Sequence, residues 1–226
     1  MCGRYTLTAN PRDLEMRFGV TMPQAARTGR YNVAPTEDVV AVARDRENGE
    51  PAAKVMRWGL WGKPVINVRT ETVLERNGFR RLAELAACRC LVLADGFYEW
   101  LTPEDRQQPR QPFRFTVHGG APFAMAGLCS WGTLAILTCA PNPLVARLHD
   151  RMPVILEGPE AEAAWLHAGL SAADALEGCV TLDEGRMASA PVSRRVNAVD
   201  PDDDGPHLLV PDPPEPGPEP ELKLFA

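Results

Sequence analysis

The sequence predicts an α+β fold: a curved, mostly antiparallel β-sheet or barrel with peripheral helices. Apolar runs of strand length recur along the chain, and short turns rich in glycine and proline separate them. Regular crossover helices, which a parallel sheet requires, are missing from the pattern. The expected strands cover 90–94, 113–117, 123–127, 134–138 and 152–156.

Helices are expected at three places around this sheet. Asn10-Pro11 supplies an N-cap and a proline at the first helical position, which predicts a helix to about Phe18. Asn142-Pro143 predicts a second helix toward Leu148. The alanine-rich stretch Pro159–His167 predicts a third.

Composition excludes several classes of protein. A chain of 226 residues with 45% hydrophobic and 24% charged residues is globular rather than fibrous or disordered. No window holds 18 uninterrupted apolar residues, and the charged start lacks a signal-peptide core, so we expect no membrane association and a cytoplasmic, nucleoid-associated protein. The six cysteines form no C-x-x-C pair, which argues against a zinc knuckle or a disulfide framework. No metal or organic cofactor is implied.

The chain divides into one domain over residues 2–210 and a tail over 211–226. The tail is rich in proline and glutamate, and we expect it to be extended and without fixed structure. Eight of the acids lie at 200–226, so the rest of the chain is nearly neutral despite a net charge of −6. Of the 24 basic residues 21 are arginine, whose fork matches phosphate, although codon bias explains the excess equally well. Bulk charge therefore leaves the partner undecided.

Cys2 is the unusual chemical feature, because P-loop, G-x-G-x-x-G, H-E-x-x-H and G-x-S-x-G signatures are missing. Removal of Met1 would leave Cys2 with a free α-amine beside its thiol. The ordinary pKa of an α-amine is about 7.7–8.0, so a useful fraction is neutral near pH 7.5. Such a pair can attack an aldehyde twice, first through nitrogen and then through sulfur, and close a thiazolidine. The alternative interpretation is a chance cysteine behind an intact Met1.

Six short motifs accompany Cys2 along the chain. They are Cys2-Gly-Arg-Tyr5, Tyr31-Asn-Val-Ala-Pro-Thr36, Arg57-Trp-Gly-Leu60, Asn67-Val-Arg-Thr-Glu-Thr72, Arg89-Cys-Leu-Val-Leu-Ala-Asp-Gly-Phe-Tyr-Glu-Trp100 and Leu148-His-Asp-Arg-Met-Pro153. In this order they resemble the SRAP (SOS response-associated peptidase) family of abasic-site processing proteins. The resemblance covers about nine-tenths of the chain and implies the SRAP fold.

The resemblance implies a role for four residues. Cys2 matches the nucleophile that captures the aldehyde of an abasic site, and Asn67 matches the amide that orients its amine. Glu99 matches the acid–base carboxylate, and His149 the histidine beside the abasic sugar. From the residues alone, Asn67 can equally cap a turn, Glu99 can form a surface ion pair, and His149 can favour a helix C-terminus.

The matched motifs also imply contacts with DNA. Phosphate contacts are expected from Arg4, Arg69, Arg80 and Arg151, with Arg76 and Arg81 as weaker candidates, and Thr138 matches a position near the lesion phosphate. Trp58 and Trp100 are expected to stack on flanking bases or to wedge a duplex end, although an aromatic residue in such a run is more often a core residue. Asn32 and Pro35 are expected to shape the loop that lines the Cys2 pocket.

The chain ends in Glu221-Leu-Lys-Leu-Phe225, which is similar to the peptides that dock into bacterial sliding clamps. Leu222, Leu224 and Phe225 would be the apolar anchors. Glu221 replaces the glutamine of those peptides, and a hydrophobic end without function is the alternative.

Together these observations predict an abasic-site sensor that binds single-stranded DNA, including single-strand/duplex junctions. It would form a thiazolidine DNA-protein crosslink through Cys2 that protects the strand from cleavage and is open to reversal. Two alternatives remain: an N-terminal-nucleophile cysteine peptidase, acting on itself or on a partner, and a catalytically silent single-strand binder.

Overall fold

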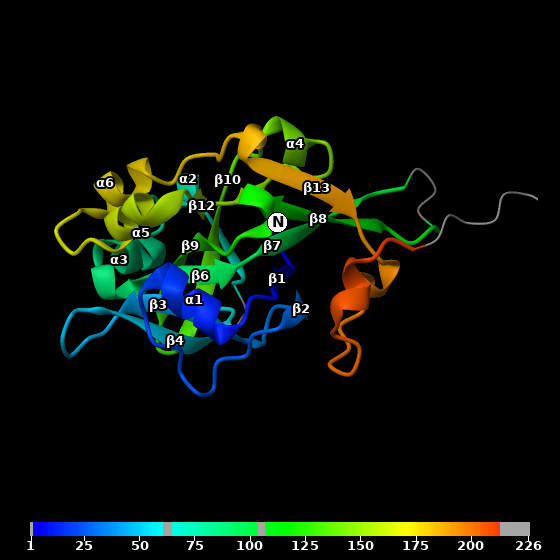
Figure 1. Cartoon of the computed structure of the whole chain (residues 1–226). Coiled ribbons are helices and arrows are strands. Elements are labelled where there is room, and N and C mark those ends of the chain that lie inside the picture. The colour runs from blue at the N-terminus through cyan, green and yellow to red at the C-terminus, as the bar shows by residue number, and fades with distance from the viewer. Residues whose placement is uncertain (1, 61–64, 104–106, 213–226) are drawn as a thin grey trace, which may run out of the picture.

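The computed structural model describes residues 2–60, 65–103 and 107–212, and its strands form two sheets (Figure 1). In chain order the strands are β1 (Tyr5–Leu7), β2 (Arg30–Val33), β3 (Asp38–Arg44), β4 (Pro51–Trp58), β5 (Asn67–Arg69), β6 (Arg89–Ala94), β7 (Gly96–Leu101), β8 (Gln111–Val117), β9 (Phe123–Ser130), β10 (Thr133–Cys139), β11 (Met152–Pro153), β12 (Ile155–Leu156) and β13 (Met187–Pro191). The helices are α1 (Pro11–Phe18), α2 (Thr70–Val73), α3 (Asn77–Glu84), α4 (Pro143–Ala146), α5 (Gly158–Leu166) and α6 (Ala172–Glu177).

The first sheet has the strand order β13-β8-β7-β1-β2, and all its pairings are antiparallel. The second sheet is ring-like: it runs β10-β4-β3-β6-β9, and β9 pairs again with β10 to close the circle. Strand β5 adds to β10 in parallel, as does β4, while the other pairings are antiparallel. The predicted α+β class with a curved, mostly antiparallel sheet is therefore confirmed.

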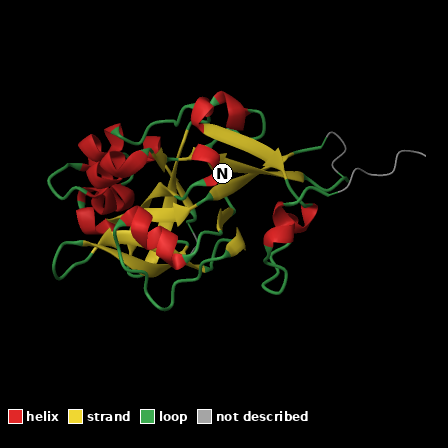
Figure 2. Ribbon diagram, viewed as in Figure 1, coloured by secondary structure: helices red, strands yellow, loops and turns green. Residues whose placement is uncertain are grey.

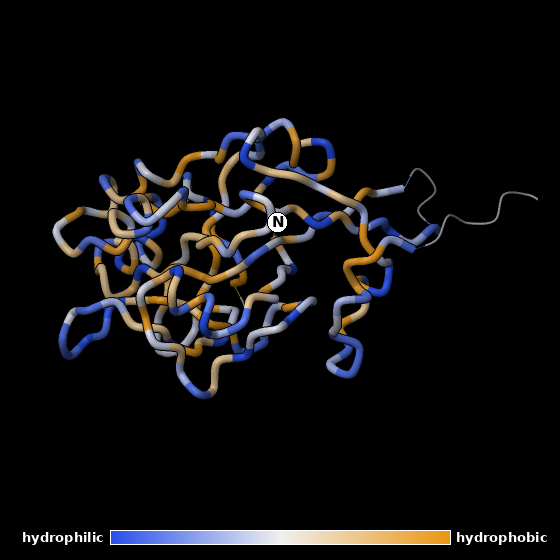
Figure 3. The backbone as a smooth tube through the Cα atoms, viewed as in Figure 1, coloured by the Kyte–Doolittle hydropathy of each residue, from blue (hydrophilic) through white to orange (hydrophobic). Residues whose placement is uncertain are grey.

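The ring is held by strands that are apolar on both faces. Every residue of β6 is buried, and β9 is buried except at Ser130. Gly127 of β9 lets three strands approach, since a Cβ there would lie 2.9 Å from the Cys90 Sγ and 3.0 Å from the Ala135 oxygen. Figure 3 shows the hydrophobic segments running through the interior and the hydrophilic ones along the loops.

The helices gather mainly at one end of the ring-like sheet, where α3 and α5 pack on β9 and α6 contacts both helices (Figure 2). The predicted helix at Pro11–Phe18 is confirmed with its cap: the Asn10 side chain accepts from the Asp13 N–H at 3.0 Å. In the part of the chain that the structure describes, no helix has the length and apolar character needed to cross a membrane.

Two boundaries differ from the prediction. Helix α4 ends at Ala146, earlier than Leu148, after which a turn continues through a bond from the Leu148 N–H to the Val145 carbonyl. The segment 152–156 is two short strands rather than one, because β11 pairs with β10 and β12 pairs with β9. Val154 between them hydrogen bonds to Leu137 of β10 and Ala126 of β9, so the segment fits between both strands.

Candidate active site

Cys2 is fully buried at the boundary between the two sheets. On one side the chain after it runs along β7, where the Tyr98 N–H donates to the Arg4 carbonyl at 3.0 Å and Tyr5 pairs with Phe97. Its Sγ lies 3.9 Å from the same Arg4 oxygen. Burial raises the pKa of the Cys2 thiol well above its usual range, and the Glu99 carboxylate raises it further. The thiol is therefore protonated at neutral pH.

Asn67 reaches Cys2 from the ring-like sheet. It begins β5, which pairs in parallel with β10, and its Nδ2 donates to the Cys2 carbonyl at 2.8 Å. Its Oδ1 is buried and accepts no hydrogen bond from the residues that the structure describes. A buried acceptor without a donor costs free energy, so Asn67 presents an acceptor beside the backbone of Cys2.

Glu99 lies on β7 and is only 2% exposed. Burial raises the pKa of Glu99 to about 8; the positive charge at the N-terminus lowers it in part, and Asp150 raises it further. Both protonation states are consequently populated near neutral pH, as acid–base chemistry requires.

His149 follows α4 and is about one-third exposed. Its Nδ1 accepts from the Arg151 N–H at 3.0 Å, which leaves the proton of the neutral ring on Nε2. Burial, followed by the charge at the N-terminus, lowers the pKa of His149, whereas Asp150, 3.0 Å from Nδ1, opposes the shift. The neutral imidazole is favoured, and His149 lies within electrostatic reach of the N-terminus, as Glu99 does.

The segment that carries Cys2 is anchored by a buried carboxylate. Asp95, which precedes β7, accepts from the Thr6 hydroxyl, from the Thr8 hydroxyl at 2.7 Å and from the Ala9 N–H at 2.9 Å. Arg114 of β8 pairs with it at 3.1 Å. Four partners, from β1, from the segment that follows it and from β8, fix β1 against β7, and hence fix the position of Cys2.

Comparisons with known proteins agree with this geometry. Residues 1–199 match the family model described as "SOS response associated peptidase (SRAP)". The chain belongs to the SRAP family. It is 34% identical over 219 residues to the abasic site processing protein YoaM of Bacillus subtilis, covering 88% of this chain and 93% of that protein. It is 32% identical to YedK of Escherichia coli, an abasic site processing protein, covering 88% and 95%.

The fold agrees with solved structures as well. A crystal structure of a protein from Bacteroides thetaiotaomicron matches with a TM-score of 0.79 at 22% identity, covering 93% of this chain and all of that one. A second, from Bordetella bronchiseptica, matches with a TM-score of 0.70 at 25% identity, covering 85% of this chain and all of that one. These matches place the two-sheet architecture of this SRAP chain in a known fold.

Arg4 and Asn32 lie together near Cys2. The Arg4 guanidinium donates to the Asn32 Oδ1 at 2.8 Å and to the Val196 carbonyl at 2.7 Å, and burial lowers the pKa of Arg4. Asn32 in turn donates to the Ala198 carbonyl at 2.8 Å. Pro35 is half-buried in the turn after β2. Asn32 thus ties the loop of the Tyr31-Asn-Val-Ala-Pro-Thr36 motif to the C-terminal part of the SRAP domain.

Three of the residues expected to contact DNA are built into the interior instead. Trp58 has no exposed surface, lies 5.3 Å from the Tyr5 ring and donates to the Ile66 carbonyl at 2.9 Å, so it is a core residue without a face for base stacking. The Thr138 side chain is fully buried with its hydroxyl 3.5 Å from the Val68 oxygen, which excludes a direct phosphate contact.

Arg151 is the third residue that was expected to contact DNA and lies in the interior instead. Only 7% exposed, it forms a bidentate pair with Glu71 at 2.6 and 2.9 Å and donates to the Thr138 carbonyl. The side-chain pair lowers the pKa of Glu71. In this structure Arg151 joins α2 to β10, and the expected direct phosphate contact is corrected to this internal role.

The other basic candidates stay on the surface. Arg69, Arg76 and Arg81 are exposed, as is Arg80, which lies 3.9 Å from Glu84 one helical turn away. A pair at this distance between exposed groups contributes little. These arginines remain predicted phosphate contacts.

A cavity of about 380 Å³ lies beside Cys2 and is lined by Gly3, Arg4, Trp100, Arg110 and Asn197. The Trp100 ring is half-buried and its Nε1 donates to the Asn197 Oδ1 at 2.7 Å, so one part of the ring faces the cavity.

Sequence reasoning missed Arg110, which stands in a polar stretch without a motif. Asp150 was also missed, although it directly follows His149 in a matched motif. Among the described residues, no three histidine, cysteine, aspartate or glutamate side chains gather as a metal site would require.

Proposed function

We propose that this chain captures abasic sites in single-stranded DNA through Cys2 and holds them as a thiazolidine. Its relatives are abasic site processing proteins, and the same lesion is the substrate proposed here. The observation that carries the proposal is the grouping around Cys2: a buried thiol, the Asn67 amide on its carbonyl, and a buried Glu99 whose pKa is about 8. The proposal requires that removal of Met1 exposes the Cys2 amine.

The covalent reaction between protein and DNA begins with the amine, once the sugar ring has opened. The neutral α-amine of Cys2 attacks the aldehyde carbon of the ring-opened sugar and forms a carbinolamine. Protonated Glu99 gives a proton to the leaving hydroxyl, water departs, and an iminium carbon remains. The buried Asn67 Oδ1 could accept a hydrogen bond from the Cys2 amine. That hydrogen bond would orient the amine so that its nitrogen lone pair faces the sugar. Neutral His149 serves the earlier step, in which a proton moves at the ring oxygen as the sugar opens.

Sulfur then closes the ring. The Cys2 thiol adds to the iminium carbon, its proton passes to the Glu99 carboxylate, and the nitrogen lone pair is restored. The net reaction joins one aldehyde to one aminothiol and releases one water. Loss of the iminium removes the electron sink that would promote β-elimination, so the DNA strand stays intact. Reversal would follow the same steps backward, with Glu99 again moving the proton.

The raised pKa of the Cys2 thiol favours attack by the amine first and the thiol second over a peptidase mechanism. A cysteine peptidase needs thiolate for its first attack, whereas burial keeps the Cys2 sulfur protonated. In the proposed route the amine attacks first, and the thiol meets an iminium, a far stronger electrophile than a peptide carbonyl. The peptidase named by the family description is therefore the second candidate, supported by that description and by Cys2 itself.

DNA would reach Cys2 across a surface with exposed cations. Arg69 follows Asn67 on β5, and Arg80 lies on the exposed face of α3. Trp100 and Arg4 line the cavity next to Cys2, where a flanking nucleotide would stack and place its phosphate. Such contacts hold the backbone without reading a base, which suits a lesion that has lost its base.

The deciding experiment mixes protein with an abasic-site oligonucleotide and resolves the products on a denaturing gel. Wild type is compared with Cys2→Ala and with a variant that carries one extra alanine between Met1 and Cys2. A denaturation-stable adduct in wild type, lost in both variants, supports the proposal. Normal DNA affinity without an adduct in wild type would instead support a silent binder, and release of a peptide without DNA would support the peptidase.

A sliding clamp remains the proposed partner of the tail. Leu222, Leu224 and Phe225 lie outside the described residues, so this idea rests on the sequence alone. A synthetic peptide of residues 211–226 should bind a bacterial clamp at tens of micromolar. A peptide with alanine at the three apolar positions is the control, and equal binding by both would remove the idea.

A further inference from the structure

The tip of the β9–β10 hairpin carries a tryptophan that is exposed to solvent and has a backbone conformation that bulky residues rarely adopt. Trp131 is 86% exposed, and its φ of 48° lies in the left-handed region. Gly132 follows with φ 74°, so both central residues of the turn have positive φ, as in hairpin turns usually built from Asn-Gly. A bulky residue at such a position is uncommon, and strained positions of this kind cluster at functional sites.

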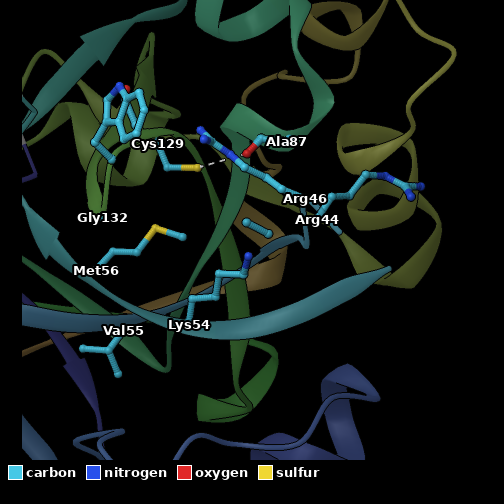
Figure 4. Close-up of a pocket in the computed structure, with 11 residues that line it drawn as sticks. Arg44, Arg46, Lys54, Val55, Met56, Ala87, Cys129 and Gly132 are labelled. Atoms are coloured by element: carbon cyan, nitrogen blue, oxygen red, sulfur yellow. Dashed lines mark hydrogen bonds between the residues drawn. The ribbon is translucent and has the colours of Figure 1, made fainter. Parts of the chain in front are cut away.

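A cavity of about 320 Å³ opens beside this tryptophan (Figure 4). Met56, Ala87 and Cys129 contribute apolar lining to it. Figure 4 shows Arg46 lying beside the Cys129 side chain and Lys54 extending from β4 below it. The Arg46 guanidinium lies over the Trp131 ring, 5.3 Å from its centroid. The cavity therefore combines an exposed indole ring, apolar lining and cationic side chains.

The two arginines of the cavity keep their positive charge available. Within the described residues, neither Arg44 nor Arg46 forms an ion pair with a carboxylate, whereas Lys54 pairs with Asp45 at 3.0 Å. Arg44 is held by the carbonyl oxygens of Leu166 and Gly49, which position it without neutralising it. Guanidinium groups beside an exposed aromatic ring suit a ligand that has both an anionic group and a flat ring.

We propose that this hairpin pocket, defined by Arg44, Arg46, Lys54 and Trp131, binds one nucleotide of the single-stranded DNA that flanks the lesion. A base would stack on Trp131, and its phosphate would lie against Arg46. The inference rests on the proposed function, which supplies the DNA. A DNA strand fits this pocket better than a free small molecule does. The Trp131 ring is almost wholly exposed, so it offers one stacking face but encloses little of a ligand.

The distance to the Cys2 site sets the length of DNA required. Asn67, which donates to the Cys2 carbonyl, pairs with Ile136 of β10, three residues from Thr133 at the hairpin tip. Three residues of strand span about 10 Å, which corresponds to roughly three stacked nucleotides. A short oligonucleotide centred on the lesion would therefore fail to reach the hairpin pocket, whereas a strand with ten nucleotides on each side would reach it.

The test measures fluorescence anisotropy of a labelled, lesion-free 21-nucleotide strand with the full chain. Trp131→Asn removes the ring and suits the left-handed turn, so the hairpin is retained; the expected loss of affinity is at least about fivefold. Trp131→Tyr keeps a ring and should stay within about twofold of wild type. Arg46→Ala should weaken binding more than Arg27→Ala, which removes an exposed arginine elsewhere.

A second arm separates this inference from the proposed function. With a 5-nucleotide abasic strand, Trp131→Asn should form the Cys2 adduct as fast as wild type; with a 21-nucleotide abasic strand it should need a higher DNA concentration for half-maximal rate. Equal anisotropy curves for wild type and Trp131→Asn would overturn the hairpin pocket, whether or not adducts form. Failure of wild type to form any adduct would overturn the proposed function, and a weakened Trp131→Asn would still support the pocket.

Discussion

The Asn67 amide donates a 2.8 Å hydrogen bond to the Cys2 carbonyl, while the other atom of the same amide, Oδ1, is buried without a donor among the described residues. Asn67 therefore links the ring-like sheet to the first residue of the reactive segment. A single amide can hold the Cys2 backbone and still offer an acceptor toward its nitrogen. This arrangement makes Asn67 the most informative residue to change.

Asn67→Ala should slow adduct formation by about 10²-fold, because it removes both the tether on Cys2 and the acceptor for its amine. Asn67→Asp should also be slow, since a carboxylate cannot donate to the Cys2 carbonyl. The measurement is the single-turnover rate of adduct formation at saturating DNA. Binding of lesion-free DNA should stay within about twofold of wild type; a parallel loss of affinity would mean that Asn67 shapes the DNA surface instead.

The raised pKa of Glu99 predicts how the rate of adduct formation depends on pH. At low pH the α-amine, with an ordinary pKa of about 7.7–8.0, is protonated and cannot attack, so the rate rises with pH. The raised pKa of Glu99, about 8, keeps its proton available up to that point, and above it the carboxylate can no longer protonate the leaving hydroxyl. The rate should therefore pass through a maximum between about pH 7 and 8.5, with limbs that belong to the coupled pair.

Glu99→Gln tests this assignment, because glutamine keeps the shape but neither gives nor takes a proton. The rate should fall by about 10²-fold near pH 7.5, and the alkaline limb should vanish. Initial rates from pH 5.5 to 9.5 provide the profile. An unchanged alkaline limb in the variant would assign that limb to another group, and a large loss of DNA affinity would count against the acid–base role.

Much of this arrangement was predictable from local sequence. Continuous apolar runs predict β6, β9 and β10, because strands covered on both faces need no alternation. The Asn10-Pro11 pair predicts the start of α1 through capping alone. The four site residues came from the order of the motifs. In the structure Asn67 contacts Cys2, and the charge at the N-terminus acts on both Glu99 and His149.

The errors have one physical cause: burial depends on partners distant in sequence. An arginine next to a motif can bind phosphate or close an interior pair, and Arg151 does the latter only because Glu71, 80 residues away, lies opposite it. Trp58 could have stacked on a base, but Tyr5 and the Ile66 carbonyl enclose its ring. The single strand expected at 152–156 divides because β9 and β10 diverge around Val154.

Asp95 provides a test of stability that is separate from chemistry. Asp95→Ala leaves the partly buried Arg114 without its carboxylate and releases Thr6, Thr8 and Ala9, so the free energy of unfolding should fall by about 3–5 kcal/mol. Gly96→Ala should also destabilise, because its Cβ would lie 2.5 Å from the Arg114 Nε and 3.0 Å from the Phe115 oxygen. Urea unfolding measures both. If Asp95→Ala unfolded at the wild-type urea midpoint, the anchor assigned to this carboxylate would be wrong.

Arg69 and Arg4 separate electrostatic steering of DNA from tethering of the fold. Arg69 is exposed, so Arg69→Ala should weaken binding of every single-stranded sequence alike at unchanged stability. The slope of log affinity against log salt should fall by about 0.7, which corresponds to one phosphate contact.

Arg4 is different, because its guanidinium also holds Asn32 and the Val196 carbonyl. Arg4→Ala should therefore lower both DNA affinity and the thermal midpoint, while Arg4→Lys should restore part of the affinity but not the full tether to Asn32 and Val196. Salt titrations and thermal unfolding of the three variants distinguish the two roles: a lower midpoint for Arg69→Ala, or an unaltered one for Arg4→Ala, would show that the assignments are reversed.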